Sequence, residues 1–373
     1  MNTVGGVVEN MDIAIIRVTS DTGEYGLGEV TFGQFCYDPI LGLVKHFKNL
    51  LIGTSVSKIN KGWNVMYNSS IFWNRQGLGI GVMGGINIAM YDLLGKTLGL
   101  PVHQLLGGAV RDRIGIYASN GLFNNPESLI ADAKRAQSMG FNAYKMRVVH
   151  PETIISQVES FRKEFGNEID LIVDAVQGSC STPWSNAISK KLAKELEPFN
   201  ILWFEEPCRV ENINGYLEVR QATNLNIAGA ESISTAREFR PYIERNAFGI
   251  VQFDIASSGF TEGLKIASLA DTYNYPVAIH SWGSIISIMA GVHLGLVLPN
   301  CTKTEYCFMD HPLNDLLSVQ NVRVVNGYLS EPQLPGLGVV FNEELLDKYP
   351  YPFTSDKNTM ISMEEREIQL ASY

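Results

Sequence analysis

The sequence lacks the features that mark membrane-bound and nucleic-acid-binding proteins. It has no run rich in Lys and Arg, and 29 basic against 39 acidic residues give a formal net charge of −10. Nucleic acid and anionic membranes are therefore poor partners. The longest apolar stretch, residues 284–299, is shorter than the ~20 residues that a membrane span needs. We expect a protein that binds neither nucleic acid nor a membrane.

Signs of export and of a disulfide framework are also missing. The N-terminal residues contain no basic segment that leads into an apolar core, so we recognise no signal peptide and expect a cytoplasmic protein. The five cysteines are an odd number and have no CxxC or Cys/His zinc spacing. Reduced thiols that pack as small apolar side chains fit this pattern better than disulfides.

Motifs of several common enzyme classes are absent as well. The chain has no GxSxG, P-loop or HExxH sequence, so serine hydrolases, P-loop nucleotide hydrolases and common zinc proteases lack support. Residues 79–84 fit GxGxxG, but no clear strand precedes them. Gln104 stands where an acidic residue would bind the ribose of a dinucleotide. We therefore exclude a dinucleotide site.

What the chain does contain, from about residue 114 to 306, is one pattern repeated eight times. An apolar or β-branched run is followed by a polar turn and an amphipathic stretch, and the runs start 23 to 32 residues apart. Each interval suits one βα unit, and eight strands in succession predict a closed barrel rather than an open sheet. The runs are IGIYAS from Ile114, AYKMRVV from Ala143, DLIVDA from Asp170, LWFEEP from Leu202, NIAGAE from Asn226, GIVQFD from Gly249, PVAIHS from Pro276 and KTEY from Lys303.

The segments that flank the barrel follow other patterns. Residues 11–30 read as two strands joined by a turn. Helices are expected around 38–51, 56–68 and 84–98. After the barrel, residues 322–349 contain short strands, a loop and the helix-like segment EELLDKY, too little for a separate domain. We predict an α+β capping domain over 1–112, a barrel over 113–318, and a C-terminal segment, 319–373, that packs back on the capping domain.

Acidic residues end three consecutive runs of the barrel. Asp174 ends the third run, Glu205-Glu206 the fourth and Glu231 the fifth. Side chains at the carboxyl ends of barrel strands face one site, where these carboxylates would repel each other unless a cation neutralised them. Oxygen ligands favour Mg²⁺, with Mn²⁺ as a substitute. The alternative is surface ion pairs, which three acidic strand ends in a row disfavour.

Further ionisable residues stand on the remaining runs. Lys145 and Arg147 are two residues apart on one strand face, where two cations could hold a substrate carboxylate and one could act on a proton. Asp254 and His280 end adjacent runs, and a carboxylate that fixes an imidazole tautomer makes a general base near neutral pH. Glu305, on the eighth run, is either an acid catalyst or an ion-pair partner.

These segments resemble, nearly end to end, the mandelate racemase and muconate lactonising branch of the enolase superfamily. The resemblance implies a modified TIM barrel, (β/α)7β, capped by the N-terminal segment and the C-terminal tail. It also implies removal of a proton α to a carboxylate, with Mg²⁺ holding the enediolate. The matching motifs are GLGE from Gly26, INIAMYDLLGKTLGLPVHQLLGG from Ile86, VDA from Val173, WFEEP from Trp203, IAGAE from Ile227, HSWGS from His280 and PGLGV from Pro335.

The resemblance also assigns the metal ligands. It makes Asp174, Glu205 and Glu231 the ligands of one Mg²⁺ per subunit, and the 26 residues from Glu205 to Glu231 are typical of the family. We expect Glu206 to lie on the opposite side of its strand by alternation and not to touch the metal.

In the same way, Asp254 and His280 match the Asp–His dyad of the family, and Glu305 resembles its electrophilic acid. The second-strand motif is a departure, because the family usually has Lys-x-Lys and this chain has Lys145-Met146-Arg147. Arg147 thus replaces the usual lysine base, and a guanidinium stays protonated, so it is a poor base.

Three other departures bear on substrate choice. Val176 stands where an Asn commonly follows the first metal ligand by two residues. The segment SCSTP at 179–183 lengthens the loop after the third barrel strand. The first capping strand of the family, with part of its specificity loop, has no clear counterpart.

Dehydration of a sugar acid to a 2-keto-3-deoxy acid fits this residue set best. His280 would remove the α-proton and, as imidazolium, protonate the leaving β-hydroxyl. A racemase needs a second group on the other face, where Arg147 is unsuitable. Lys145, with its pKa lowered by Arg147, could serve there, which keeps racemase, epimerase and lactone cycloisomerase as alternatives.

A catalytically idle scaffold is a further alternative, which the complete acidic set and His280 argue against. We also expect a small-molecule carboxylate as the partner and a homo-oligomer.

Overall fold

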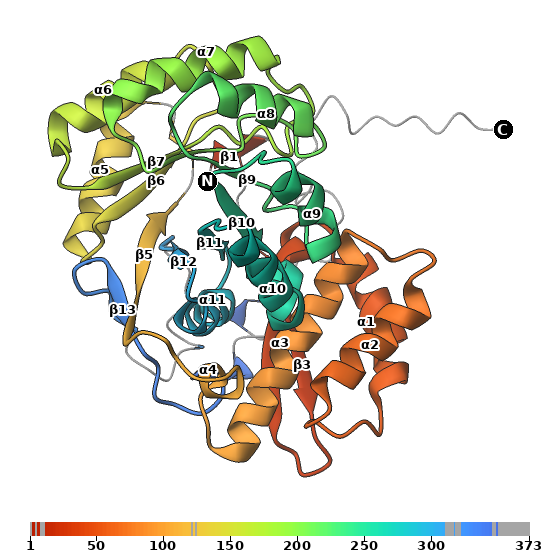
Figure 1. Ribbon diagram of the computed structural model, residues 1–373. Helices are drawn as coiled ribbons and strands as arrows, with labels where there is room; N and C mark the ends of the chain where they lie inside the picture. The colour runs from red at the N-terminus through yellow and green to blue at the C-terminus, as the bar shows by residue number, and fades with distance from the viewer. Residues whose placement is uncertain are drawn as a thin grey trace, which may run out of the picture.

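A closed parallel barrel forms the centre of the computed structural model (Figure 1). The structure describes residues 2–3, 6–7, 12–120, 122–123, 125–309, 317, 322–344 and 348–349. Each strand pairs in parallel with the next, and β12 pairs back with β5 from Lys303↔Gly115 to Cys307↔Ser119, which closes the barrel. The strands are β5 (Arg113–Ser119), β6 (Ala143–Arg147), β7 (Asp170–Asp174), β8 (Trp203–Glu205), β9 (Ile227–Gly229), β10 (Ile250–Asp254), β11 (Val277–His280) and β12 (Cys301–Cys307).

Helices on the outside connect these strands. Asn125 shows why one of them starts where it does: its side chain accepts a hydrogen bond from Ser128 N at 2.8 Å, and Pro126 follows at the first helical position. The connecting helices are α5 (Pro126–Ser138), α6 (Ile154–Phe165), α7 (Asn186–Leu196), α8 (Ile213–Ala222), α9 (Ala236–Glu244), α10 (Ile255–Thr272) and α11 (Ile285–Val297). Eight strands joined by these seven helices form the predicted (β/α)7β barrel.

The N-terminal segment forms the predicted α+β capping unit. Strands β3 (Ala14–Thr19) and β4 (Tyr25–Val30) pair in antiparallel fashion, and the short helix η1 (Thr31–Gln34) follows. Four helices complete the unit: α1 (Tyr37–Leu51), α2 (Ile59–Ser70), α3 (Leu78–Leu98) and α4 (Val102–Leu105). Backbone at 2–3 and 6–7 forms the two-residue strands β1 and β2. The rest of 1–11 lies outside the described residues, so the missing first capping strand stays a prediction.

Helix α3 begins at Leu78, six residues before the predicted start at 84, and it contains the GxGxxG segment. Its glycines serve close packing. A Cβ at Gly84 would lie 2.5 Å from the carbonyl oxygen of Ser257 in α10, and a Cβ at Gly28 in β4 would lie 1.9 Å from that of Gly85. The dinucleotide motif is therefore a contact surface between the capping unit and the barrel.

Among the described residues, α3 is also the one helix long and apolar enough to cross a membrane by length and composition. Asp92 and Lys96 interrupt its sequence, so the longest uninterrupted apolar stretch lies instead at residues 284–299. Of its most apolar window, 83% is buried inside the protein. Burial between β4 and α10 explains this composition, since a helix enclosed on all sides is apolar all round.

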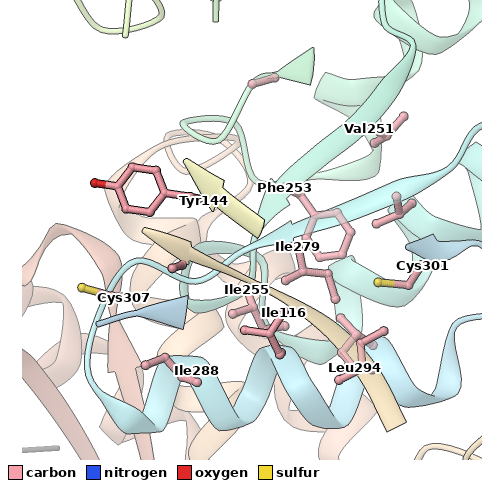
Figure 2. Close-up of a cluster of buried hydrophobic side chains, with 14 of the residues drawn as sticks. Ile116, Tyr144, Val251, Phe253, Ile255, Ile279, Ile288, Leu294, Cys301 and Cys307 are labelled. Atoms are coloured by element: carbon pink, nitrogen blue, oxygen red, sulfur yellow. The ribbon is translucent and has the colours of Figure 1, made fainter. Parts of the chain in front are cut away.

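The main apolar core lies between the strands and the surrounding helices (Figure 2). Phe253 and Ile279 project outward from β10 and β11, and Leu294 of α11 belongs to the same cluster; all three side chains are fully buried. Burying such a side chain contributes ~1.5–3 kcal/mol.

A second, smaller cluster fills the inside of the barrel and forms its floor. It consists of Tyr117, Ala143, Ile172, Trp203, Ala228, Ile250 and Ala278.

The C-terminal tail contacts both units. As predicted, part of it packs on the capping unit: Leu337 N donates to Asp92 Oδ1 at 2.7 Å, and Phe341 N donates to the Tyr25 hydroxyl at 3.2 Å. The strand β13 (Tyr328–Ser330) instead pairs with the first residues of β5, which we did not expect. The cause is that β6 pairs with β5 only at Ala118–Ser119, so the start of β5 is left for β13. The middle of the predicted helix at 343–349, residues 345–347, lies outside the described residues.

Candidate active site

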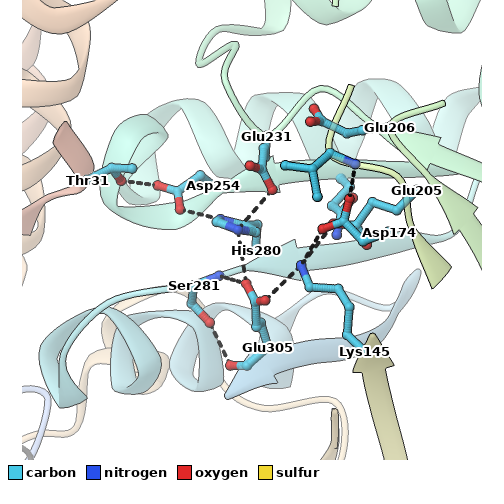
Figure 3. A network of polar contacts seen from close by, with 12 residues as sticks. Thr31, Lys145, Asp174, Glu205, Glu206, Glu231, Asp254, His280, Ser281 and Glu305 are labelled. Carbon is cyan, nitrogen blue, oxygen red and sulfur yellow. Dashed lines mark hydrogen bonds and ion pairs between the residues drawn. The ribbon is translucent and has the colours of Figure 1, made fainter. Parts of the chain in front are cut away.

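Charged side chains gather where the barrel strands end (Figure 3). Parallel register aligns them: Arg147 is paired with Asp174, Asp174 with Glu205, and Asp254 with His280. Each lies at or next to the carboxyl end of its strand, as barrel geometry predicts. The structure thus brings together all the predicted site residues, which are Lys145, Arg147, Asp174, Glu205, Glu231, Asp254, His280 and Glu305.

Asp174 and Glu205 share Lys145 as a partner. Asp174 Oδ1 accepts a hydrogen bond from Val176 N at 2.8 Å, and its Oδ2 lies 3.7 Å from Lys145 Nζ. Glu205 accepts two hydrogen bonds, one from Lys145 Nζ at 2.9 Å and one from the indole Nε1 of Trp203 at 2.8 Å. The ion pairs with Lys145 place these two carboxylates on one side of the mouth.

Glu231 faces them from the turn two residues after β9 and is the most open of the three proposed ligands. Its side chain is 28% exposed, against 4% for Asp174 and 0% for Glu205. Its Oε2 lies 3.0 Å from His280 Nε2. Glu231 therefore links the acidic side of the mouth to the imidazole.

The charge balance fits a divalent cation. Burial and the nearby Glu205 raise the pKa of Asp174 to about 7, so its charge is poorly compensated. Oxygen donors of this kind suit Mg²⁺. In the described part of the chain, no three acidic, His or Cys side chains are already arranged as a set of metal ligands. The cause is that Lys145 pairs with Glu205 while His280 pairs with Glu231, which keeps the carboxylates apart. The network contains six carboxyl groups and three cationic groups. The carboxyl groups are those of Asp174, Glu205, Glu206, Glu231, Asp254 and Glu305, and the cationic groups are those of Lys145, Arg147 and His280.

Glu206 does not lie where alternation predicted. Its φ of 43° breaks the extended backbone, and its carboxylate is 2% exposed and accepts a hydrogen bond from Ala230 N at 3.3 Å. Burial, followed by the charges of Glu231 and Asp174, raises the pKa of Glu206 well above its ordinary value. The expectation that Glu206 points away from the acidic site was wrong, because strand alternation ends at Glu205.

Backbone strain is concentrated at these same strand ends. Val176, Glu206 and Ala230 have φ angles of 54°, 43° and 77°, and each stands within two residues of a proposed ligand. This region is unfavourable for L-residues, above all for a β-branched one. Such strain is typical of functional sites, where the surrounding structure holds it in place.

Asp254 and His280 lie side by side, as the sequence predicted. His280 Nδ1 lies 2.6 Å from Asp254 Oδ2, so its Nε2 points toward Glu231 and Glu305 at 3.0 and 3.2 Å. Burial lowers the pKa of His280, but Glu231 and Glu305 outweigh it and raise the pKa well above the ordinary value. His280 is thus charged while it is the counter-charge of Glu231, and a cation bound to Glu231 would lower the pKa of His280 again.

Lys145 corrects one expectation. It is fully buried, 2.9 Å from Glu205 and 2.8 Å from Glu305. Burial and Arg147 lower its pKa, but Glu205 and Glu305 outweigh them, so the pKa of Lys145 is raised well above its ordinary value. Arg147 lowers this pKa as expected, but the expected net lowering was wrong because the two carboxylates were not considered.

Arg147 is held in one place by its neighbours. Its Nη1 donates to the carbonyl oxygen of Asn120, and its guanidinium lies 5.0 Å from the ring centre of Trp282. Burial lowers its pKa, but nearby carboxylates, Glu305 first among them, raise it overall. Arg147 is therefore a fixed cation, which suits a group that holds an anion.

Several residues that contact the predicted set were missed, Trp203 and Thr31 among them. Trp203 stands two residues before Glu205, so alternation could have placed both on the inner face. Thr31 of η1 donates to Asp254 across 223 positions of sequence, and no local pattern signals such a contact.

Comparison with known proteins agrees with this architecture. Residues 1–107 match the mandelate racemase / muconate lactonizing enzyme N-terminal domain, and residues 128–345 match the enolase C-terminal domain-like family. A D-galactonate dehydratase of Ralstonia pickettii is 32% identical over 349 residues, which cover 89% of each chain.

Solved structures give the same result. The 3,6-anhydro-D-galactonate cycloisomerase of Zobellia galactanivorans is 33% identical, with a TM-score of 0.84 over 90% of this chain and 93% of that one. A racemase from Streptomyces coelicolor with bound magnesium shares the fold at 24% identity, with a TM-score of 0.81 over 90% and 91% of the two chains. The chain belongs to the mandelate racemase and muconate lactonizing enzyme family of the enolase superfamily.

Proposed function

We propose that this protein removes the proton α to the carboxylate of a sugar acid, with Mg²⁺ bound, and expels the β-oxygen to give a 2-keto-3-deoxy acid. The observation that carries the proposal is the Asp254–His280 pair beside a cluster of under-compensated carboxylates. The D-galactonate dehydratase relative supports dehydration as the reaction and a six-carbon aldonate as the substrate class.

Asp174, Glu205 and Glu231 would hold the metal ion. When bound, Mg²⁺ supplies Lewis-acid stabilisation of the negative charge that develops on the substrate carboxylate. Lys145 and Arg147 add fixed positive charge beside the same carboxylate, because both pKa values are raised. These cations favour binding of an acid over that of a neutral sugar.

His280 would carry the proton. Its Nδ1 is engaged by Asp254, so Nε2 is the atom that accepts the α-proton as the C–H electrons move toward the carboxylate. The C–O bond at the β-carbon then breaks, and His280 returns the proton to the leaving oxygen. Tautomerisation of the resulting enol gives the 2-keto product, so one histidine serves both steps.

A cycloisomerase is the second candidate, favoured by the 33% identity with the Zobellia enzyme. In a 3,6-anhydro acid the oxygen on the β-carbon belongs to the ring. The same elimination therefore opens the ring and releases no water, which yields an isomer. Epimerisation needs a second base on the opposite face. Lys145, whose pKa Glu205 and Glu305 raise, would serve there only if Mg²⁺ bound to Glu205 lowered that pKa.

Product analysis tests the proposal. We would incubate the protein and MgCl₂ with D-galactonate, with 3,6-anhydro-D-galactonate and with a library of acid sugars, and detect 2-keto acids by semicarbazide absorbance. A 2-keto product from D-galactonate supports dehydration, and one from the anhydro acid alone supports the cycloisomerase. EDTA should stop either reaction.

Deuterium incorporation without a keto product would instead favour an epimerase. No product and no Mg²⁺ binding by calorimetry would favour a catalytically idle scaffold. The homo-oligomeric state and cytoplasmic location stay predictions.

A further inference from the structure

The capping unit reaches the dyad at the end of β4. Thr31 follows this strand directly, and its hydroxyl donates to Asp254 Oδ1 (Figure 3). Thr31 belongs to the N-terminal unit, whereas Asp254 and His280 belong to the barrel. A residue of the other unit thus contacts the carboxylate that orients the imidazole.

The geometry of Asp254 shows what this contact does. Asp254 is 1% exposed, and both carboxylate oxygens have hydrogen-bond partners. Oδ2 lies 2.6 Å from His280 Nδ1. Oδ1 accepts hydrogen bonds from Ser257 N at 2.7 Å and from the Thr31 hydroxyl. Ser257 N belongs to the first turn of α10, which Asp254 caps. The Thr31 hydroxyl is a second donor on Oδ1, and two donors from different elements restrict rotation of the carboxylate more than one.

Glu29, two residues earlier, fixes the segment that follows His280. Its carboxylate accepts hydrogen bonds from Ser284 N at 3.1 Å, from the Ser284 hydroxyl at 2.5 Å and from Ser287 N at 3.3 Å. A Cβ at Gly283 would lie 2.3 Å from Glu29 Oε1, so the loop packs directly on this carboxylate. The end of β4 therefore holds both the dyad carboxylate and the loop after the dyad imidazole.

We propose that Thr31 is a positioning residue that aligns the Asp254–His280 base, so that the capping unit completes the proton-transfer group. The inference rests on the proposed function in that His280 is taken as the base. Thr31 itself need not touch the substrate. Its loss should lower the rate of proton transfer and leave substrate binding nearly unchanged.

Kinetics of three variants test this role. Thr31→Val keeps the shape and removes the hydroxyl. It should lower kcat about tenfold, the lower end of the range for outer-shell partners of metal-bound histidines, and leave KM within about twofold. Thr31→Ser should restore kcat to within about twofold of wild type. Thr97→Val is the matched control, because it removes a hydroxyl bond of 2.9 Å to Leu93 O within the capping unit but away from the dyad. It should change neither constant.

A spectroscopic measurement makes the test independent of turnover. The Nδ1 proton of an imidazole bound to a buried carboxylate resonates far downfield in the proton NMR spectrum, and His280→Asn assigns the signal. Wild type, Thr31→Ser and Thr97→Val should show this resonance, and Thr31→Val should shift or broaden it. Thr31→Ala replaces Thr31→Val if the latter does not fold.

The outcomes separate the two proposals. An unchanged kcat and resonance in Thr31→Val would overturn the role of Thr31, as would failure of Thr31→Ser to restore them or absence of the resonance from wild type. If no acid sugar is turned over, the proposed function fails, and the resonance alone still decides whether Thr31 holds the pair.

Discussion

The inside of the barrel has two layers that differ completely in chemistry although the same strands build them. Ala143 and Lys145 of β6 face inward two residues apart, as do Ile172 and Asp174 of β7. On β8, Trp203 and Glu205 repeat the pattern. Along each of these strands, the apolar floor and the ionised layer are thus only two residues apart.

The difference shows how the floor makes the charged layer reactive. Charged groups that stand on a dry, packed floor lose water from below, so their pKa values depend on their neighbours. Burial raises the pKa of Asp174, whereas at His280 burial alone would lower the pKa and the charges of Glu231 and Glu305 raise it.

The largest effect is expected for His280→Asn. Asparagine keeps a polar side chain but cannot take a proton, so turnover and exchange of the α-proton with D₂O should both fall on the order of 10³-fold. Exchange followed by NMR and product formation by absorbance measure the two losses. Arg147→Lys is the comparison variant and should retain exchange, since His280 remains. Exchange at near wild-type rate in His280→Asn would move the base to Lys145 or another group.

Moving a charge down one layer should destabilise the fold. Ile172→Asp places a carboxylate on the floor beneath Asp174, among mainly apolar side chains. Burial of an unpaired charge should lower the free energy of unfolding by about 3–5 kcal/mol. Urea unfolding measures this change, and Ile172→Val, with an expected cost of ~0.5–1.5 kcal/mol, is the control. A loss for the Asp variant no greater than that of the control would show that the floor is wet.

The charged layer should also make stability depend on pH and Mg²⁺. The pKa of Asp174 is raised to about 7 and that of His280 is raised well above its ordinary value, so between pH 5 and 8 the folded protein binds more protons than the unfolded chain. Stability of the metal-free protein should therefore fall as the pH rises through this window. Mg²⁺ should raise Tm more at pH 8 than at pH 5. A larger shift at pH 5, measured by thermal unfolding, would contradict the proposed excess of negative charge.

Most of the barrel could be predicted because its signals are local. Each of the eight strands lies on a predicted run, and barrel geometry then placed Asp174, Glu231 and His280 at one mouth. Glu206 could not be placed, because its positive φ is imposed by tertiary packing and no sequence rule replaces alternation there. The raised pKa of Lys145 likewise depends on two carboxylates that only the folded barrel brings within 3 Å.

Trp203 joins the two layers, since its ring belongs to the floor and its Nε1 donates to Glu205 at 2.8 Å. Trp203→Phe removes the donor and leaves most of the ring. We expect a loss of ~1–3 kcal/mol in stability, because a buried charged acceptor loses a partner. Mg²⁺ affinity, measured by calorimetry, should rise or stay equal as the Glu205 oxygen is freed. A large loss of affinity would show instead that Trp203 holds Glu205 in its ligand position.

The smallest effect concerns strain at the edge of the charged layer. Val176 has a φ of 54°, and its backbone N–H donates to Asp174 Oδ1 at 2.8 Å. A β-branched residue is strained in this conformation, whereas Asn adopts it more readily. Val176→Asn should therefore stabilise the protein by ~1 kcal/mol in urea unfolding, with kcat nearly unchanged because the backbone bond to Asp174 remains. Unchanged or lower stability would mean that packing of the Val176 methyl groups outweighs the strain at this strand end.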